Sequence, residues 1–143
     1  MKSTALVGRL LFSALFLFSF PGHFKHETIA FSAAQGVPLA SLLVPASGIL
    51  ELVGALSIIL GYRARWGAAA LIAFLIPVTF MMHPFWSVSD PMGHQIQFVM
   101  FMKNISLVGA ALMIVQLGAG AYSLDARTES RKPEGRRTAA VAA

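Results

Sequence analysis

The chain has 143 residues, of which 57% are hydrophobic and only 12% are charged. A soluble domain has about 25% charged residues. The apolar residues here also form long blocks, so we predict a small membrane protein that crosses the bilayer several times. The absence of cysteine excludes disulfides, thiol redox chemistry, thiolate-bound zinc and iron–sulfur clusters within this chain. The net charge of +5 comes from basic residues in one loop and near the C-terminus. That pattern is typical of membrane orientation and does not indicate nucleic-acid binding.

Four apolar blocks predict an all-α fold, a four-transmembrane-helix bundle within residues 1–124. Spanning the hydrocarbon core takes about 20 helical residues. The first block also has the basic start of a signal peptide, but its end, FPGH at 20–23, lacks the small residues of a cleavage site. We therefore interpret it as a retained helix. The expected helices are 4–21, 39–60, 65–83 and 91–118.

The segments between and after these blocks are short. Residues 25–35 have helical spacing and Gly36 is a stop signal, which predicts a short outer interfacial helix between helices one and two. Asp90 and Pro91 predict the N-cap and the first turn of the fourth helix. Residues 125–143 are charged and Ala-rich without an apolar face, so we expect a basic, disordered cytoplasmic tail.

Basic residues predict the orientation of the chain. They begin the first helix, fill the loop between helices two and three, and follow the fourth helix: Lys2, Arg9, Arg63, Arg65, Arg127, Arg131, Lys132, Arg136 and Arg137. Since positive loops stay inside, we expect both termini in the cytoplasm. The sequence thus predicts a multi-pass protein of a bacterial inner (plasma) membrane. Tyr62, Trp66 and Tyr122 fit an aromatic belt on the inner side.

Two opposite charges, Glu51 and Lys103, lie near the middles of the second and fourth helices. A charge at the bilayer centre costs about 2.5–3.5 kcal/mol on insertion scales, so we expect the two to be paired inside the membrane. Arg9 could reach inward from the first helix, and Asn104 could close hydrogen bonds. The resulting network either fixes helix packing or forms a site for a polar headgroup, a quinone carbonyl or a proton.

All four histidines are expected on the outer side: His23, His26, His83 and His94. Imidazoles bind metals and relay protons, and His83, His94 and Gln95 form a candidate outer site. The alternative is that these side chains simply tolerate the headgroup region. No tight histidine spacing occurs in the sequence, so no metal is predicted.

Short motifs in a fixed order resemble the DoxX family of small four-helix membrane proteins. They are GRLL at 8–11, QGVP at 35–38, LELVGA at 50–55, LGYRAR at 60–65, HPFW at 83–86, FMKNI at 101–105 and SLDAR at 123–127. The resemblance covers about residues 4–127 and implies a four-helix membrane fold. It implies Arg9, Glu51, Lys103 and Asn104 as the polar residues of the family pattern, without a role for each. The family takes its name from a subunit of an archaeal thiosulfate:quinone oxidoreductase, so the resemblance also implies redox complexes.

Three classes of function remain open. The first is a non-catalytic membrane subunit of a redox complex, with an oxidoreductase partner protein and a quinone as ligand, because no flavin or nucleotide motif is present. The second is a small transporter or proton-linked carrier, supported by ionisable groups at the midplane. Four helices are few for this role unless the chain forms a homo-oligomer. The third is a structural assembly protein. The sequence contains no nucleophile–base pair and no phosphate loop, so no catalytic residue is predicted.

Overall fold

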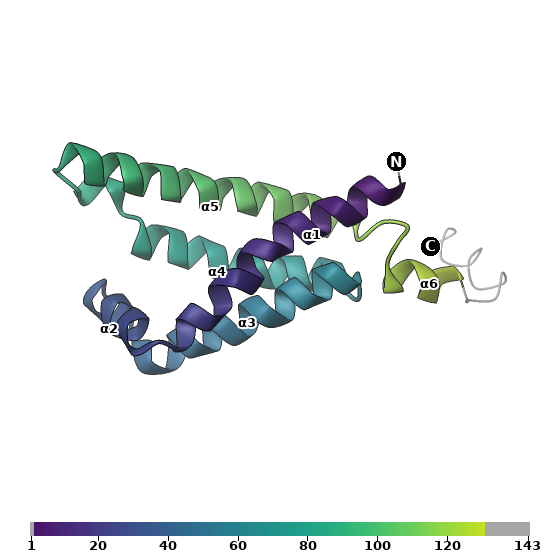
Figure 1. Cartoon of the computed structure of the whole chain (residues 1–143), viewed down its shortest axis with the longest axis horizontal. Coiled ribbons are helices and arrows are strands. Elements are labelled where there is room, and N and C mark those ends of the chain that lie inside the picture. The colour runs from purple at the N-terminus through teal and green to yellow at the C-terminus, as the bar shows by residue number, and fades with distance from the viewer. Residues whose placement is uncertain (1, 131–143) are drawn as a thin grey trace, which may run out of the picture.

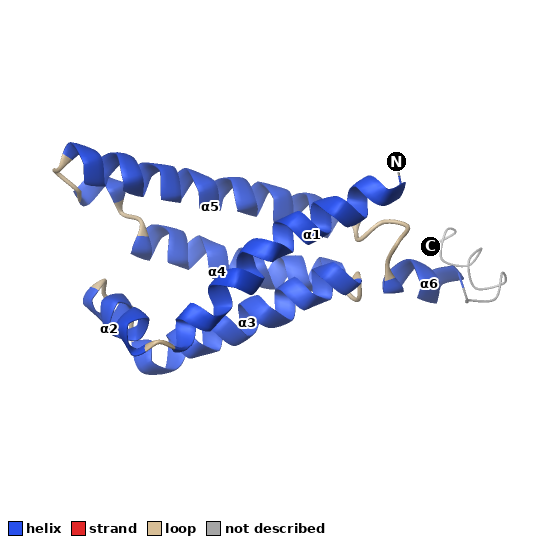
Figure 2. Ribbon diagram, in the orientation of Figure 1, coloured by secondary structure: helices blue, strands red, loops and turns tan. Residues whose placement is uncertain are grey.

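The computed structural model describes residues 2–130, and every regular element in that range is a helix. Figure 2 shows the helices joined by short loops, with no strand between residues 2 and 130. In chain order the elements are α1 (Lys2–Ser19), η1 (Phe20–Phe24), α2 (His26–Ala34), α3 (Ala40–Leu60), α4 (Ala64–Met82), η2 (Phe85–Ser87), α5 (Pro91–Leu117) and α6 (Leu124–Ser130).

The prediction of an all-helical membrane protein is confirmed. Four segments are long and apolar enough to cross a bilayer, and they contain α1, α3, α4 and α5. The ends of these helices lie within two residues of the expected ones. The start of α5 follows from local chemistry, since the Asp90 carboxylate accepts a hydrogen bond of 2.6 Å from the Gly93 N–H and Pro91 begins the helix.

The four long helices form an open arc in which each one packs on its neighbour along the chain. α1 packs on α3, α3 on α4 and α4 on α5, whereas α1 and α5 form no comparable interface. Figure 1 places the start of α1 and helix α6 at one end of the molecule, which we call the terminal end. α2 lies at the opposite end, which we call the far end. The bundle is therefore open along one side, between α1 and α5.

Small residues hold α3 and α4 close together. A Cβ on Gly54 would lie 2.9 Å from the Leu71 side chain, and one on Gly67 would lie 2.6 Å from Ser57 Oγ. Such contacts are shorter than side chains tolerate, so glycine is required at this crossing. Close approach of this kind is the usual basis of helix association in lipid. The fully buried Ala55, Ile58, Ala68 and Leu71 form the core beside it, together with Phe16 and Ala111.

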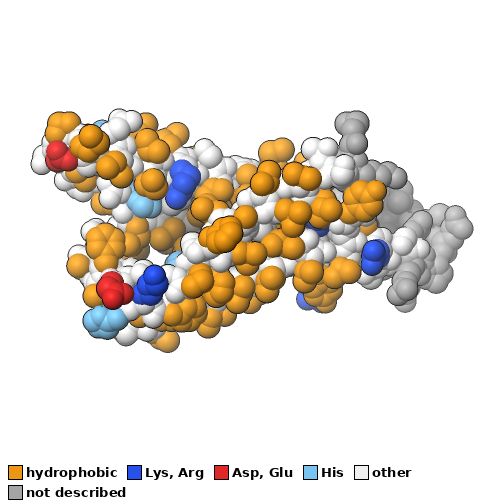
Figure 3. All heavy atoms as spheres, viewed as in Figure 1, with side chains coloured by type: hydrophobic (Ala, Val, Ile, Leu, Met, Phe, Trp, Pro, Cys, Tyr) orange, Lys and Arg blue, Asp and Glu red, His pale blue; other side chains and the backbone are white. Residues whose placement is uncertain are grey.

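Large hydrophobic side chains cover the outside of the molecule. Leu11, in the middle of α1, is 72% exposed, and Phe18, near its end, is 86% exposed. Figure 3 shows hydrophobic side chains spread over most of the visible surface between the two ends, with charged groups few and mostly near the ends. A surface of this kind is expected where lipid tails, and not water, surround the helices.

Two short helices, α2 and α6, lie in the segments that were predicted to be outside the membrane-spanning helices. α2 forms where a helix was predicted, and the chain leaves it through Gly36 at a φ of 87°. Its interfacial position and the orientation of the termini stay predictions.

The expected disordered tail is wrong for residues 125–130, which are helical in α6. This helix forms because the Asp125 N–H donates to the Gly61 carbonyl at 2.8 Å and so ties it to the bundle. The remaining tail, 131–143, lies outside the described residues.

Candidate intramembrane site

Glu51 is buried in the membrane-spanning part of the molecule. It lies halfway along α3 and is only 3% exposed. The Ser19 hydroxyl, at the end of α1, donates a hydrogen bond of 2.8 Å to Glu51 Oε2. The Nε2 atom of His23 lies 3.4 Å from the same oxygen, which makes this the ion pair of the site when the imidazole is protonated. Glu51 therefore faces the protein interior.

His23 reaches Glu51 because the chain turns back after α1. Pro21 enters the short η1 helix, which packs against α3. The contact requires glycine at position 48, since a Cβ there would lie 2.7 Å from His23 Cβ. Burial of a carboxylate costs free energy unless it gains partners, and this turn supplies one of them.

The hydrogen bonds of His23 define its tautomer. Its Nδ1 lies 2.8 Å from Ser47 Oγ, and that hydroxyl donates its own proton to the Val44 carbonyl at 2.7 Å. Nδ1 must therefore carry a proton and donate it to Ser47. The unprotonated Nε2 then faces Glu51 Oε2 at 3.4 Å. Both atoms are acceptors, so a proton placed on either one would let it donate to the other. The His23–Glu51 pair can thus hold and release a single proton.

A cavity of about 140 Å³ lies beside Glu51, and all four long helices contribute to its wall. Its polar lining residues are Ser19, Glu51, His83, Lys103 and Asn104. Leu15, Phe16, Phe74 and Leu107 supply much of the apolar wall. This volume is what about five water molecules occupy in liquid water. A cavity of that size fits a small polar ring or headgroup but not a larger ligand.

Lys103 and Asn104 face this cavity from α5. Asn104 is buried at 6% exposure, whereas Lys103 is exposed at the rim. The expected Glu51–Lys103 ion pair is not formed. Within residues 2–130 the ion pair closer than 4.0 Å is the one between His23 and Glu51. The two charges instead lie on the wall of one cavity, because α5 packs on α4 and not directly on α3, the helix that carries Glu51.

Arg9 belongs to a different part of the molecule, so the expected Arg9–Glu51 contact is wrong. Its guanidinium donates to the backbone carbonyl of Tyr122. The reason is helix length: Ser19 is the α1 residue level with Glu51, and Arg9 precedes it by ten residues, or about 15 Å of helix. No side chain spans that distance.

Arg9 is part of a clasp at the terminal end, formed by Arg9, Gly61, Tyr122 and Asp125. Arg9 is 4% exposed, and its Nη1 lies so close to Gly61 that a Cβ there would be 2.2 Å away. Gly61 has a φ of 62° and ends α3, where the helix dipole favours a cation. The Asp125 carboxylate accepts from the N–H groups of Arg63 at 2.8 Å and Ala64 at 3.2 Å. The clasp joins α1 to the end of α3 and to the starts of α4 and α6.

The structure does not bring the candidate outer residues together. His83 Nδ1 pairs with Gln97 Oε1 at 2.8 Å, and His83 lines the intramembrane cavity. His94 lies with its ring centroid 5.6 Å from that of Phe85, while Gln95 is exposed. They separate because successive residues of α5 point to different faces of the helix. The part of the chain that the structure describes contains no group of three or more His, Asp or Glu side chains able to hold a metal ion.

Helices that cross a bilayer around an internal polar cavity define a multi-pass membrane protein. Residues 4–84 match the sequence profile of the DoxX family. The chain belongs to the DoxX family, as the motifs indicated. No solved structure matches the chain.

Three relatives are similar over most of this chain. The inner membrane protein YphA of Escherichia coli is 30% identical over 125 residues, which cover 85% of this chain and 88% of YphA. The inner membrane protein YqjF of the same organism is 30% identical over 122 residues, covering 84% of this chain and 88% of YqjF. A Surfeit locus protein 4 homolog of Schizosaccharomyces pombe is 28% identical over 84% of this chain and 36% of its own length. The predicted multi-pass, inner-membrane location is confirmed.

Proposed function

We propose that this protein is the membrane subunit of a redox complex and that it binds the ring of a quinone in the intramembrane cavity. The observation that carries the proposal is the arrangement of Glu51 and Lys103, two unlike charges that face one cavity without pairing. Glu51 is buried and Lys103 lies at the exposed rim of the cavity. Ionisable groups within membrane-spanning helices are costly and usually functional. A ligand with two separated polar atoms between the charges would satisfy both sides.

A quinone ring has the required chemistry. Its two carbonyl oxygens are hydrogen-bond acceptors. The Lys103 ammonium and the Asn104 amide can donate to one of them, and the Glu51 carboxyl can donate to the other when it carries the proton of the His23–Glu51 pair. Its isoprenoid tail would leave through the open side between α1 and α5, which faces lipid tails. Reduction to the quinol takes two electrons and two protons. The His23–Glu51 pair can supply one proton. The two electrons and the second proton would come from an oxidoreductase partner, since this chain has no cysteine and no flavin motif.

Co-purification from native membranes tests the proposal. Tagged wild-type protein, Glu51→Gln and Lys103→Gln are purified in mild detergent, and mass spectrometry measures quinone per protein together with partner proteins. Glu27→Gln and Lys25→Gln are matched controls, because these two exposed residues do not line the cavity. We expect quinone in the wild type and both controls, and at least a tenfold loss in the two cavity variants.

Equal quinone content in Glu51→Gln, Lys103→Gln and the controls would contradict the quinone site. A pure protein with neither quinone nor oxidoreductase partner would contradict the whole proposal. The cost of either substitution to folding is checked by size-exclusion chromatography and circular dichroism in the same detergent.

A proton-linked carrier is the second candidate, and the His23–Glu51 pair favours it. The geometry of the pair would let it hold one proton inside the membrane-spanning region, as proton-coupled carriers require. A homo-oligomer would supply the further helices that such a carrier needs. Proton flux into liposomes that contain the purified protein, lost in Glu51→Gln, would favour the carrier. An assembly protein without chemistry would show neither flux nor quinone.

A further inference from the structure

A second cavity lies at the terminal end, between the start of α4, the end of α5 and helix α6. It has a volume of about 730 Å³, which makes it far larger than the intramembrane cavity. Two arginines, Arg63 and Arg65, line it, together with the aromatic rings of Tyr62 and Trp66. Trp66 is 77% exposed, and exposed aromatic residues at the end of a membrane-spanning helix mark the depth of the lipid headgroups.

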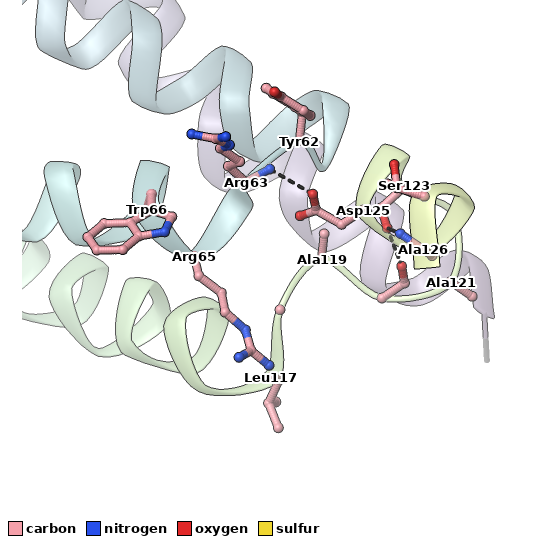
Figure 4. Close-up of a pocket in the computed structure, with 13 residues that line it drawn as sticks. Tyr62, Arg63, Arg65, Trp66, Leu117, Ala119, Ala121, Ser123, Asp125 and Ala126 are labelled. Carbon is pink, nitrogen blue, oxygen red and sulfur yellow. Dashed lines mark hydrogen bonds between the residues drawn. The ribbon is translucent and has the colours of Figure 1, made fainter. Parts of the chain in front are cut away.

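Arg65 is a cation that can bind a ligand here, while the Arg63 guanidinium lies over the Tyr62 ring, 5.8 Å from its centroid. Arg65 Nη2 makes one long hydrogen bond, 3.4 Å, to the Gln116 carbonyl, and Arg65 has no acidic partner within 4.0 Å in the described part of the chain. Figure 4 shows Arg65 extending toward Leu117 at the end of α5, while the Asp125 carboxylate is turned to the Arg63 backbone. The acid in this cavity is therefore engaged as a helix cap and does not neutralise Arg65 directly.

An apolar groove adjoins this cavity. It has a volume of about 330 Å³ and lies between α1 and α5 on the open side of the bundle. Ala5, Gly8, Phe12 and Met113 line it. The groove and the basic cavity share the wall formed by residues 117–120. A cationic cavity at headgroup depth thus stands next to a hydrocarbon groove that faces the bilayer.

We propose that these two cavities together bind one anionic phospholipid, with its phosphate on Arg65 and an acyl chain in the groove between α1 and α5. Basic pockets between membrane helices are a recognised way to hold acidic headgroups. The combination of the two cavities distinguishes a lipid from a soluble phosphate, since a free phosphate would gain nothing from the groove. The lipid would cover the side of α1 that no other helix within residues 2–130 covers.

Native mass spectrometry of the full-length protein in mild detergent tests the site, with phosphatidylglycerol as the probe and phosphatidylcholine as the neutral comparison. Arg65→Gln should lower phosphatidylglycerol occupancy about fivefold, the factor one basic residue contributes near an anionic membrane surface. Arg127→Gln is the matched control, because Arg127 is exposed on α6 and does not line the cavity. Arg65→Lys, which keeps the charge, should retain most of the binding and so separates lost binding from lost folding.

The groove has its own pair of variants. Both Gly8 in α1 and Gly109 in α5 have open space where a Cβ would stand, so leucine fits at either position, but only Gly8 lines the groove. Gly8→Leu should lower phosphatidylglycerol occupancy severalfold, and Gly109→Leu should leave it unchanged. Equal effects of Arg65→Gln and Arg127→Gln would overturn the phosphate site. Displacement of the lipid by millimolar inorganic phosphate, or no difference between the two glycine variants, would overturn the lipid and leave a soluble anion site.

Discussion

The terminal end and the middle of this molecule use their charged side chains in different ways. At the terminal end, Arg9 and Asp125 bind backbone groups, namely the Tyr122 carbonyl and the N–H groups that begin α4. In the middle of the membrane, Glu51 and Lys103 instead face a shared cavity. A charge that satisfies backbone atoms fixes the fold, whereas charges arranged around a cavity are available to a ligand. The comparison predicts that variants of the clasp lose stability and variants of the cavity lose binding.

The largest expected effect on stability is at Gly61. Gly61→Ala places a Cβ on a left-handed residue, at a φ of 62°, within 2.2 Å of Arg9 Nη1 and 2.3 Å of Ser123 Cβ. The strain and the overlap together should lower the free energy of unfolding by about 2–4 kcal/mol. Unfolding in mixed detergent measures it. Gly109→Ala is the control, since a Cβ there meets nothing within 4 Å. If the two variants unfold alike, the clasp is not formed.

A smaller loss is expected from Asp125→Ala, which removes the hydrogen bonds that begin α4. Loss of a helix cap costs about 0.5–2 kcal/mol. Asp90→Ala provides the comparison, because Asp90 caps α5 at its first turn. Both variants should lose similar stability, but only Asp125→Ala should release α6. Hydrogen exchange of the backbone amides in residues 119–130 separates the two, and unchanged protection there would contradict the role given to Asp125.

The smallest expected effect is a coupling energy. A double-mutant cycle between Glu51→Gln and His23→Gln should give a coupling of about 0.5–3 kcal/mol, because the two side chains are in contact. The same cycle between Glu51→Gln and Arg9→Gln should give about 0.5 kcal/mol or less. The free energy of unfolding of each single and double variant supplies both numbers. A coupling energy between Arg9 and Glu51 as large as that between His23 and Glu51 would contradict the separation of Arg9 from Glu51 along α1.

The helices of this protein could be predicted closely because their signals are local. Hydrophobic blocks define α3 and α4, and the Asp90–Pro91 pair defines the start of α5. The burial of Glu51 agrees with a local signal, since the small residues Ser47, Gly48, Gly54 and Ala55 surround it at helical spacing. A charged side chain in a membrane helix avoids lipid, and small residues around it allow a neighbouring helix to pack over it.

The partners of Glu51 could not be predicted because they depend on a turn. His23 was expected among headgroup-facing histidines, since it follows the Pro21–Gly22 end of the first apolar block. In the structure this sequence forms η1 and returns the chain to α3, so His23 lies against Ser47 and Glu51. The one available signal was Gly48, whose missing side chain admits the turn. Gly48 indicates that another segment packs closely on α3, but the sequence does not show that this segment is η1.

The clasp has a consequence for how the chain assembles during synthesis. Each long helix packs on its neighbour in chain order, so α1, α3, α4 and α5 can dock one after another as they leave the insertion machinery. Arg9 is the exception, because its acceptor on Tyr122 lies 113 residues later in the sequence. This cation therefore stays without its acceptor until a residue 113 positions later has been made. Completion of the clasp thus reports that the whole membrane domain has been inserted.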